Sequence, residues 1–510
     1  MTISMVISWL ASTLPQSLGQ PTVILAAIIG LALLLLLRAD ERSRLNLPPG
    51  PWALPYVGNL LMFAGRSSEP YLVSSELADK YGAVYSLYFG NYLTVFFNDY
   101  QTIKEVFVKQ SAVFSDRPRS LKLWKETVEG IGLGLANGKD FDDVHRTTIR
   151  SLREAGVGTY KVEQRILTEA EHLCAELEKL NGEPFDCTQV TQSAFSNLTF
   201  NICLGERFDD YSDSKFRMMV NHLYNFLDDM RIAMTESFLP ILGAFRPDTM
   251  ISKLKQSLVT MDEVIGEYTS AHKESHIAGC ASDCLDLFVE RQMKEPDNPL
   301  YSDLFINRTI GGVLNGGIES TQTGMRWLLL YFLHYPHIQK RCFDQINEVL
   351  GTVEKPSWEM REKLTYVMAT LLEVLRHANI APQGVPHAAS RDTMVNGYFI
   401  PKDTMVFMNL YHVHMDPKYW PEPKAFKPER WIDGQGKLIR HEAFIPFSIG
   451  KRHCLGEQLA KQELLLVTVC LLQKFEFVLP ENYKLPDLKG IQKLSLAPKQ
   501  YLVCVKPRSI

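Results

Sequence analysis

The chain has 510 residues and a net charge of −4, with charges of both signs interspersed along it. That balance gives no basic footprint for nucleic acid, so we expect no nucleic-acid partner. The nine cysteines are odd in number and irregularly spaced, which argues against a disulfide framework and favours a reducing compartment. Length alone would allow about three domains, but no repeat, Ser/Gly-rich linker or long charge run follows residue 50. One large domain is the simpler prediction.

An apolar segment lies near the N-terminus. Every residue from Val23 to Leu37 is apolar or glycine, and no Lys or Arg precedes Arg38. As a helix this run spans roughly 22 Å, so flanking residues or local thinning must complete the crossing of a bilayer core of about 27–30 Å. We expect a single membrane anchor within residues 1–44. A cleaved signal peptide is the rival, although it lacks a positive n-region, and a soluble core helix is the other alternative. The positive-inside rule puts the rest of the chain in the cytosol, because arginines follow at positions 38, 42 and 44.

A proline-rich segment, LPPGP at 47–51, follows the anchor. It can form neither helix nor central strand, and we expect a stiff spacer that opens a domain over residues 45–510. Beyond it the pattern predicts a helix over 70–80 and a small hairpin from period-2 stretches at 84–89 and 92–97. From about 100 to 380 the pattern is mostly helical, and hairpin signals return at 393–406 and near the C-terminus. The predicted fold class is mainly α (α+β), a helix-rich domain with small sheets.

Three local patterns resemble ligand-binding motifs, but each lacks features that a binding site of its kind requires. The glycine-rich run Gly130–Gly134 has no clear strand-loop-helix frame, so we expect no nucleotide there. His412 and His414 lack a third ligand of suitable type for zinc. Cys280 and Cys284 lack a second pair of metal-ligand type, and we expect them to be structural.

The most informative stretch is Phe447–Gly456, which reads FSIGKRHCLG. Cys454 stands at the N-terminus of a helical pattern that runs to Leu472. A thiolate is stable where a helix dipole and cations favour negative charge, and Lys451 and Arg452 precede this cysteine. The pattern therefore predicts that Cys454 is an anionic metal ligand and not a buried apolar filler.

The neighbouring residues suit a planar cofactor. Gly450 permits an unusual backbone conformation, and Gly456 lets the helix start approach a flat macrocycle closely. Phe447 would pack on such a ring, and Arg452 would pair with a carboxylate such as a haem propionate. The spacing of these residues and Cys454 resembles the haem-binding signature of the cytochrome P-450 family of haem-thiolate monooxygenases.

The resemblance implies the cytochrome P-450 fold, with haem b whose iron is ligated by Cys454. It also implies that 120–135 is a variable loop over the substrate pocket. Where the family commonly has a Trp and an Arg that touch the propionates, this chain has Phe141 and His145. We therefore expect the propionates to be held by the remaining cationic or polar candidates, Arg452, His387 and Arg146.

A long helix is predicted at Phe305–Tyr331, although it contains Gly311, Gly312, Gly316 and Gly317 close together. Each costs about 1 kcal/mol against alanine in a helix interior, so a ligand groove or tight helix packing must compensate. Within it Gly316–Thr321 resembles the family's acid-alcohol motif, in which the two side chains relay protons to dioxygen bound at the haem. Glu319 is the acid and Ser320 the alcohol, where the family usually has threonine, and Thr321 is a possible substitute.

Other motifs of the family appear in its order. Glu373 and Arg376 lie three apart in a predicted helix, 366–377, and a PERW segment at Pro428–Trp431 resembles the one that locks such a pair into a buried, structural network. Gly490–Pro498 resembles a pocket-lining turn. The apolar segment Phe238–Phe245 is either a buried loop or, by the resemblance, a second membrane contact.

The resemblance implies a monooxygenase of the animal drug- and steroid-metabolising type in the endoplasmic reticulum membrane. NADPH would supply electrons through NADPH-cytochrome P-450 reductase, and one atom of O2 would enter a small hydrophobic substrate by hydroxylation or epoxidation. The reductase would dock on a cationic face comprising Lys451, Arg452, Arg146, Arg150 and Arg153. Two alternatives stay open: a thiolate-haem isomerase or dehydratase that needs no reductase, and a non-catalytic haem-binding membrane protein.

Overall fold

The computed structural model describes residues 30, 42–127, 130–239, 249–277, 279–351 and 354–508. Nearly all of the predicted anchor, 23–37, and most of the predicted membrane contact, 240–245, lie outside these residues. Among the helices that are described, none combines the length and the apolar character needed to cross a bilayer.

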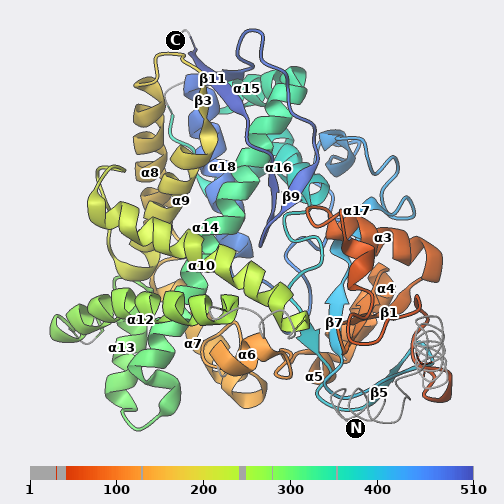
Figure 1. Ribbon diagram of the computed structural model, residues 1–510. Helices are drawn as coiled ribbons and strands as arrows, with labels where there is room; N and C mark the ends of the chain where they lie inside the picture. The colour runs from red at the N-terminus through yellow and green to blue at the C-terminus, as the bar shows by residue number, and fades with distance from the viewer. Residues whose placement is uncertain are drawn as a thin grey trace, which may run out of the picture.

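Helices form most of the domain (Figure 1). The α-helices are α3 (Pro70–Tyr81), α4 (Tyr100–Lys104), α5 (Ser111–Phe114), α6 (Lys122–Thr127), α7 (Gly138–Glu154), α8 (Tyr160–Glu178), α9 (Cys187–Leu204), α10 (Ser214–Phe238), α12 (Met250–Glu274), α13 (Cys284–Lys294), α14 (Asp303–His334), α15 (Pro336–Leu350), α16 (Thr365–Ala378), α17 (Leu410–Met415) and α18 (Glu457–Lys474). Short 3₁₀ or π turns are η1 (Leu60–Phe63), η2 (Glu105–Lys109), η3 (Pro299–Tyr301), η4 (Trp358–Glu362) and η5 (Pro428–Trp431).

Small sheets occupy the periphery. The strands are β1 (Val84–Phe89), β2 (Tyr92–Phe97), β3 (Phe185–Asp186), β4 (His387–Ala388), β5 (Thr393–Val395), β6 (Tyr398–Ile400), β7 (Met405–Met408), β8 (Phe475–Val478), β9 (Gly490–Gln492), β10 (Leu496–Pro498) and β11 (Leu502–Pro507). The largest sheet has the order β1-β2-β7-β4, and the others are β10-β9, β3-β11-β8 and β5-β6.

The predicted hairpins are present, with one addition. β1 and β2 pair antiparallel with Val84 opposite Phe97, and β5 pairs with β6. β7 begins at the end of the predicted hairpin region 393–406, but it does not pair within that hairpin and instead runs parallel to β2, with Thr94 opposite Met405. This pairing joins segments that lie about 300 residues apart, and a local periodicity cannot reveal it.

The proline-rich segment is irregular, as predicted, but it is not free of the domain. Pro48 accepts a hydrogen bond from Ser86 Oγ at 2.7 Å, and Pro49 accepts one from the Ser86 N–H at 2.7 Å. A Cβ on Gly50 would lie 1.9 Å from the Ser86 carbonyl oxygen, so only glycine allows this close approach. The segment is thus fixed along β1.

The longest helix, α14, runs through the helical part of the molecule (Figure 1). It packs against α9, α12, α16 and α18, and most of its side chains are buried. It ends at His334, because Pro336 opens α15 and disfavours helical backbone in the residue before it. The prediction of one long helix at 305–331 is confirmed, with a few more residues at each end.

Candidate active site

Cys454 lies in a tight loop just before α18. Its N–H donates to the Phe447 carbonyl at 3.0 Å, and the His453 N–H donates to the Gly450 carbonyl at 3.1 Å. Gly450 has φ +85°, and a Cβ there would lie 1.9 Å from the Phe107 carbonyl oxygen. Glycine is therefore required at position 450 for two reasons, its left-handed backbone and its contact with η2.

The environment of the Cys454 sulfur is unusual. The side chain is exposed, although burial raises the pKa of its thiol. The Cys454 side chain is accessible, yet protein atoms surround it closely enough to raise its pKa. We infer that the sulfur faces a hollow in the protein and not the outer surface. The N–H groups of Gly456 and Glu457 at the start of α18 donate toward the sulfur and act in the opposite direction, lowering its pKa. The sulfur is thus oriented for a ligand whose own positive charge would complete the stabilisation of a thiolate.

The two cations before Cys454 do not face its sulfur. Lys451 pairs with Asp142 at 2.6 Å. Arg452 turns inward and donates to the carbonyls of Ser115 at 2.8 Å, Leu133 at 3.3 Å and Ala136. The expectation that both cations stabilise the thiolate is corrected, because the local electrostatic support comes from backbone amides.

Arg452 belongs to a buried cationic cluster. Burial lowers the pKa of its guanidinium to about 10, and its guanidinium carbon lies 3.4 Å from the centre of the Phe141 ring. The guanidinium of Arg117 is buried too, and burial followed by repulsion from Arg452 moves its pKa well below the ordinary range. In the described part of the chain the Arg117 guanidinium donates only to backbone carbonyls, those of Gly134 at 3.1 Å and of Val385 and Pro386.

No carboxylate in the described part of the chain lies within ion-pair distance of Arg117 or Arg452. Arg117 is buried and Arg452 is partly buried, and Asp116 and Asp142 act on Arg452 only from beyond ion-pair distance. Two repelling cations in such a setting are costly unless an anion joins them. A dianionic edge such as that of haem supplies such an anion, so the residues present fit the group. Sequence reasoning missed Arg117, because an arginine before a proline carries no local signal of its burial beside Arg452.

His387, one of the residues expected to hold the propionates, lies beside Arg117 and Arg452. It lies in β4, and its Nδ1 is 2.7 Å from the Phe114 carbonyl oxygen. Burial, with repulsion from Arg117 and Arg452, lowers its pKa well below the ordinary value, so the imidazole is neutral near pH 7.

The structure does not bring Arg146 to this cluster. Its side chain is exposed and pairs with Asp143 at 2.7 Å. Phe141 and His145, one helical turn apart on α7, do lie beside Arg452. Their rings are 5.0 Å apart, and burial followed by repulsion from Arg452 lowers the pKa of His145.

The four glycines at positions 311, 312, 316 and 317 of α14 divide into two pairs. A Cβ on Gly311 would meet Ile265 of α12 at 3.2 Å, and one on Gly317 would meet Thr199 of α9 at 3.2 Å. A Cβ on Gly312 or Gly316 would meet nothing within 4 Å. Both explanations of the glycines therefore hold, since one pair permits close helix packing and the other borders open space.

Ser320 shares the open face. Positions 312, 316 and 320 follow one another at four-residue spacing on one side of the helix, and all three are exposed although the helix is otherwise mostly buried. The Ser320 hydroxyl donates to the Gly316 carbonyl at 2.7 Å. The predicted alcohol therefore lies on the exposed face of α14.

The two sequence neighbours of Ser320, Glu319 and Thr321, point away from the exposed face of α14. Glu319 is buried and accepts hydrogen bonds from Ser495 Oγ at 2.6 Å and Gln322 Nε2 at 2.9 Å. Thr321 is buried against α18, where its hydroxyl bonds to the Glu463 carboxyl. Thr321 is therefore not on the open face with Ser320.

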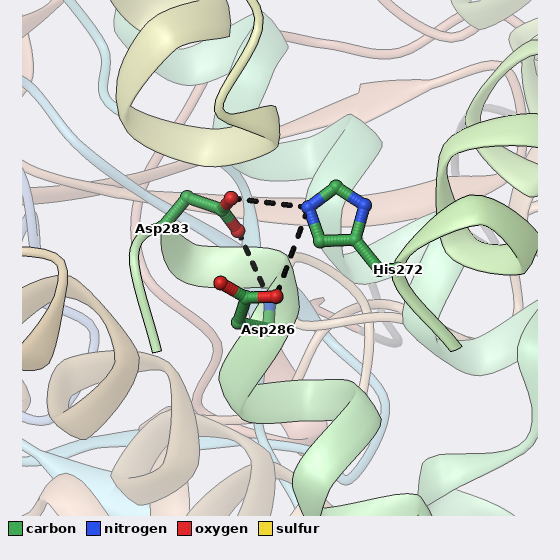
Figure 2. A group of neighbouring side chains, drawn as sticks. All are labelled: His272, Asp283 and Asp286. Carbon is green, nitrogen blue, oxygen red and sulfur yellow. Dashed lines mark hydrogen bonds and ion pairs between the residues drawn. The ribbon is translucent and has the colours of Figure 1, made fainter. Parts of the chain in front are cut away.

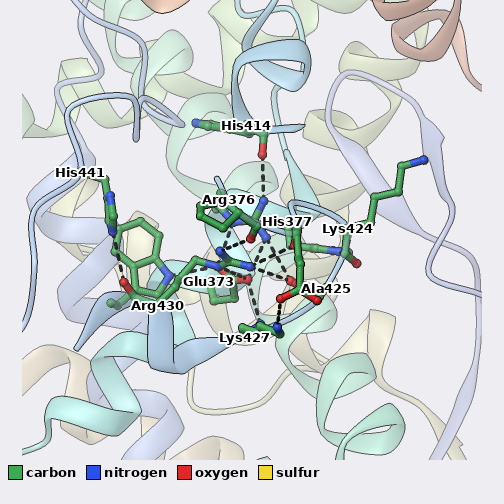
Figure 3. Close-up of polar contacts among 12 residues, drawn as sticks. Glu373, Arg376, His377, His414, Lys424, Ala425, Lys427, Arg430 and His441 are labelled. Carbon is green, nitrogen blue, oxygen red and sulfur yellow. Dashed lines mark hydrogen bonds and ion pairs between the residues drawn. The ribbon is translucent and has the colours of Figure 1, made fainter. Parts of the chain in front are cut away.

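The predicted structural network is fully assembled (Figure 3). Arg376 donates to Glu373 from Nε at 2.8 Å and from Nη2 at 2.7 Å, and neither side chain is exposed. Glu373 also accepts from Arg430 Nε at 3.0 Å, Trp431 Nε1 at 3.0 Å and the Lys427 N–H at 2.9 Å. Burial alone would raise the pKa of Glu373, but the bonds and charge of Arg376, the Lys427 N–H and the charge of Arg430 together outweigh it and hold that pKa below the ordinary value.

The network extends to the cysteine loop. Arg376 Nη1 donates to the His414 carbonyl at 2.8 Å, and His414 Nε2 accepts the Ile445 N–H at 3.1 Å. Burial lowers the pKa of His414 to about 3, so its imidazole stays neutral and keeps that lone pair. The chain reaches Phe447 only two residues after Ile445, and the network therefore braces the loop that carries Cys454.

Comparisons with known proteins agree with this geometry. The sequence profile of the family described as Cytochrome P450 matches residues 48–505. The chain is 33% identical over 515 residues to cytochrome P450 2U1 of Bos taurus, covering 95% of this chain and 93% of that protein. It is 33% identical over 484 residues to human cytochrome P450 2J2, covering 93% and 94%, and 33% identical over 508 residues to cytochrome P450 2J5 of Mus musculus, covering 99% of both.

The chain belongs to the cytochrome P450 family. It is an oxidoreductase of the monooxygenase type, and it is similar to animal cytochromes P450 whose names begin with 2, such as 2U1 and 2J2. Its cofactor is haem bound through a cysteine thiolate.

Proposed function

We propose that Cys454 is the thiolate ligand of the haem in this monooxygenase. The observation that carries the proposal is the sulfur itself, which is exposed toward a hollow while the amides at the start of α18 donate to it. When bound, the haem supplies activation of dioxygen for insertion of one oxygen atom, and a thiolate ligand favours cleavage of the O–O bond. Gly450 and Gly456 shape the loop, and Phe447, partly buried beside it, limits access of water to the sulfur.

The buried cations hold the carboxylates of the cofactor. Arg452 and Arg117 present guanidinium groups without carboxylate partners in the described chain, and guanidinium matches carboxylate geometry. His387 adds a neutral donor or acceptor beside them. Arg146 is left out of this proposal because its side chain is exposed and paired with Asp143.

Ser320 moves protons at its Oγ on the open face of α14. To do so its hydroxyl must exchange the bond to the Gly316 carbonyl for one to a bound reactant or water. Glu319 would replenish the proton, and it must first rotate away from Ser495 and Gln322, which now hold its carboxyl. A positioned acid-base pair contributes typically 10²–10⁴-fold to a proton-transfer step.

The substrate is a small hydrophobic molecule, xenobiotic, steroid or fatty-acid-like, that is hydroxylated or epoxidised. We place residues 1–44 as a single anchor in the endoplasmic reticulum membrane, with the catalytic domain, 45–510, in the cytosol. The apolar run at 23–37 and the arginines after it support that placement. An apolar substrate would then reach the domain partly through the membrane.

NADPH-cytochrome P-450 reductase supplies the electrons, and α7 carries the docking face that we propose for it. Arg146, Arg150 and Arg153 are exposed on α7 and line a groove of about 560 Å³ together with Arg291 of α13. Arg452, which the sequence suggested for this face, is directed inward. Docking through exposed cations slows as salt is added, so reductase-supported turnover that does not respond to salt would contradict this face.

Reconstituted turnover tests the whole proposal. The full-length protein, the reductase and NADPH are incubated under ¹⁸O₂ with a panel of lipophilic substrates, and we expect a product that carries one ¹⁸O atom. Omission of NADPH or of the reductase should abolish it. A product that forms equally without both would favour the isomerase or dehydratase alternative, and Glu319→Gln or Ser320→Ala variants with unchanged turnover and coupling would refute the relay.

A further inference from the structure

Three side chains of ligand type converge where α12 ends and α13 begins (Figure 2). His272 lies in the last turn of α12, Asp283 is the N-cap of α13, and Asp286 lies in its first turn. His272 Nε2 is 3.0 Å from Asp283 Oδ2 and 3.9 Å from Asp286 Oδ1. One ligand atom from each residue lies within 4.8 Å of the other two.

Each of these side chains is held by a second contact on its far side. Asp283 Oδ1 accepts the Asp286 N–H at 3.0 Å. Asp286 Oδ2 accepts from Ser282, from the N–H at 2.7 Å and from Oγ at 2.9 Å. His272 Nδ1 lies 2.8 Å from the Tyr268 carbonyl oxygen, which requires a proton on Nδ1. These contacts leave His272 Nε2 and Asp286 Oδ1 available, and the third converging atom, Asp283 Oδ2, accepts only a longer bond from Ser282 Oγ at 3.3 Å besides its contact with His272.

The proton on His272 Nδ1 determines which kind of ion can lie between the three converging side chains. In a neutral imidazole, Nε2 then carries a lone pair, and it faces two carboxylate oxygens that are acceptors as well. Acceptors directed at one another need a cation between them, either a second proton on His272 or a metal ion. The bond from Nδ1 to a backbone carbonyl is also the usual support of a metal-ligating histidine.

We infer that His272, Asp283 and Asp286 form a binding site for a divalent metal ion of the zinc type. Zinc takes one imidazole nitrogen and two carboxylate oxygens readily, and it commonly keeps a fourth position for water. Asp283 is almost fully buried, while 15% of the His272 side chain and 17% of the Asp286 side chain are exposed. One side of the site is therefore open for entry of the ion and for a water ligand.

The inference goes beyond the monooxygenase reaction and concerns the packing of the helices. The ion would fix the end of α12 to the start of α13, and α12 packs on α14, the helix that carries Ser320. No other group of three potential metal ligands of this kind occurs among the residues that the structure describes.

Zinc binding to the haem-loaded, full-length protein tests the inference. The protein is stripped with a chelator, gel-filtered, equilibrated with micromolar Zn²⁺ and analysed for zinc per haem. We expect about one equivalent in the wild type that is lost in His272→Ala, and binding at least about tenfold weaker in Ser282→Ala, which removes the hydroxyl that supports Asp286. His337→Ala, which removes an exposed histidine on α15, is the matched control and should keep the zinc.

Two results would overturn the inference. A wild type that binds no zinc would show that a proton alone joins the three side chains as an ion pair. Equal binding by the wild type and His272→Ala would place the zinc elsewhere. Should His272→Ala fail to retain haem, Asp286→Asn decides, because this partly exposed residue can lose its charge without a cavity and the variant is still expected to lose the zinc.

Discussion

The Glu373→Gln substitution tests the network that braces the cysteine loop. The carboxylate of Glu373 accepts five hydrogen bonds, from Arg376, Arg430, Trp431 and Lys427. An amide keeps the shape of the side chain but offers one acceptor oxygen, and its NH₂ group would face donors. Two arginines would then remain buried without their counter-charge.

The expected cost follows from that burial. Breaking a buried ion pair by removing one partner destabilises a protein by about 3–5 kcal/mol. For the domain over residues 48–505 the unfolding entropy is roughly 1 kcal/mol/K, so the expected fall in Tm is about 3–5 °C. Because its pKa lies below the ordinary value, Glu373 contributes this stability above about pH 4.5, and the contribution is lost as the pH falls through its folded pKa.

Thermal unfolding followed by circular dichroism, beside haem retention, measures the effect. The matched control is Asp344→Asn, the same chemical change in an exposed pair with Lys340 on α15, which we expect to shift Tm by less than about 1 °C because exposed pairs contribute little. A Glu373→Gln variant as stable as this control, with normal haem content, would refute the reasoning.

Three further predictions concern the site. Burial raises the pKa of Glu463 to about 8 despite its bond to Thr321, so its contribution to stability is full below about pH 4.5 and is lost as the pH rises through 8; Glu463→Gln should remove that part of the pH dependence in urea titrations, and an unchanged profile would contradict it. Ser320→Ala should lower product per NADPH and raise peroxide, whereas Ser320→Thr should preserve coupling; peroxide measurements that do not separate the two would count against the relay. Arg117→Leu, which removes one of two repelling cations, should stabilise the haem-free protein yet weaken haem retention, measured by transfer of haem to apomyoglobin; faster loss without apoprotein stabilisation would argue for a purely structural role.

The helices and hairpins were largely predictable because their signals are local. The periodicity at 70–80, 305–331 and 366–377 and the alternation at 84–97 reflect side chains that face a core at 3.6- or 2-residue spacing. The parallel pairing of β2 with β7 was not predictable, since it depends on where a distant chain segment returns. The docking of the prolines on β1 escaped prediction for the same reason.

At the site, residue types were predictable and their directions were not. The sequence motifs indicated Cys454, Arg452 and Ser320, and the structure shows that Cys454 and Ser320 are exposed and that Arg452 lies beside Arg117. Glu319 and Thr321 are adjacent to Ser320 in sequence, but successive helix residues point about 100° apart, and both are buried against other elements. Arg117 could be found only in the fold, because what distinguishes it is its burial beside Arg452, which no local pattern shows.

The carbon-monoxide difference spectrum of the reduced, membrane-expressed protein tests the central claim most directly, with Cys454→Ala as its control. If Cys454 is the haem ligand, the wild type will give a strongly red-shifted Soret band that the variant lacks. A bluer band of the histidine-ligated type in folded wild-type protein, or a red-shifted band that persists in Cys454→Ala, would contradict the assignment of the ligand and the site built around it.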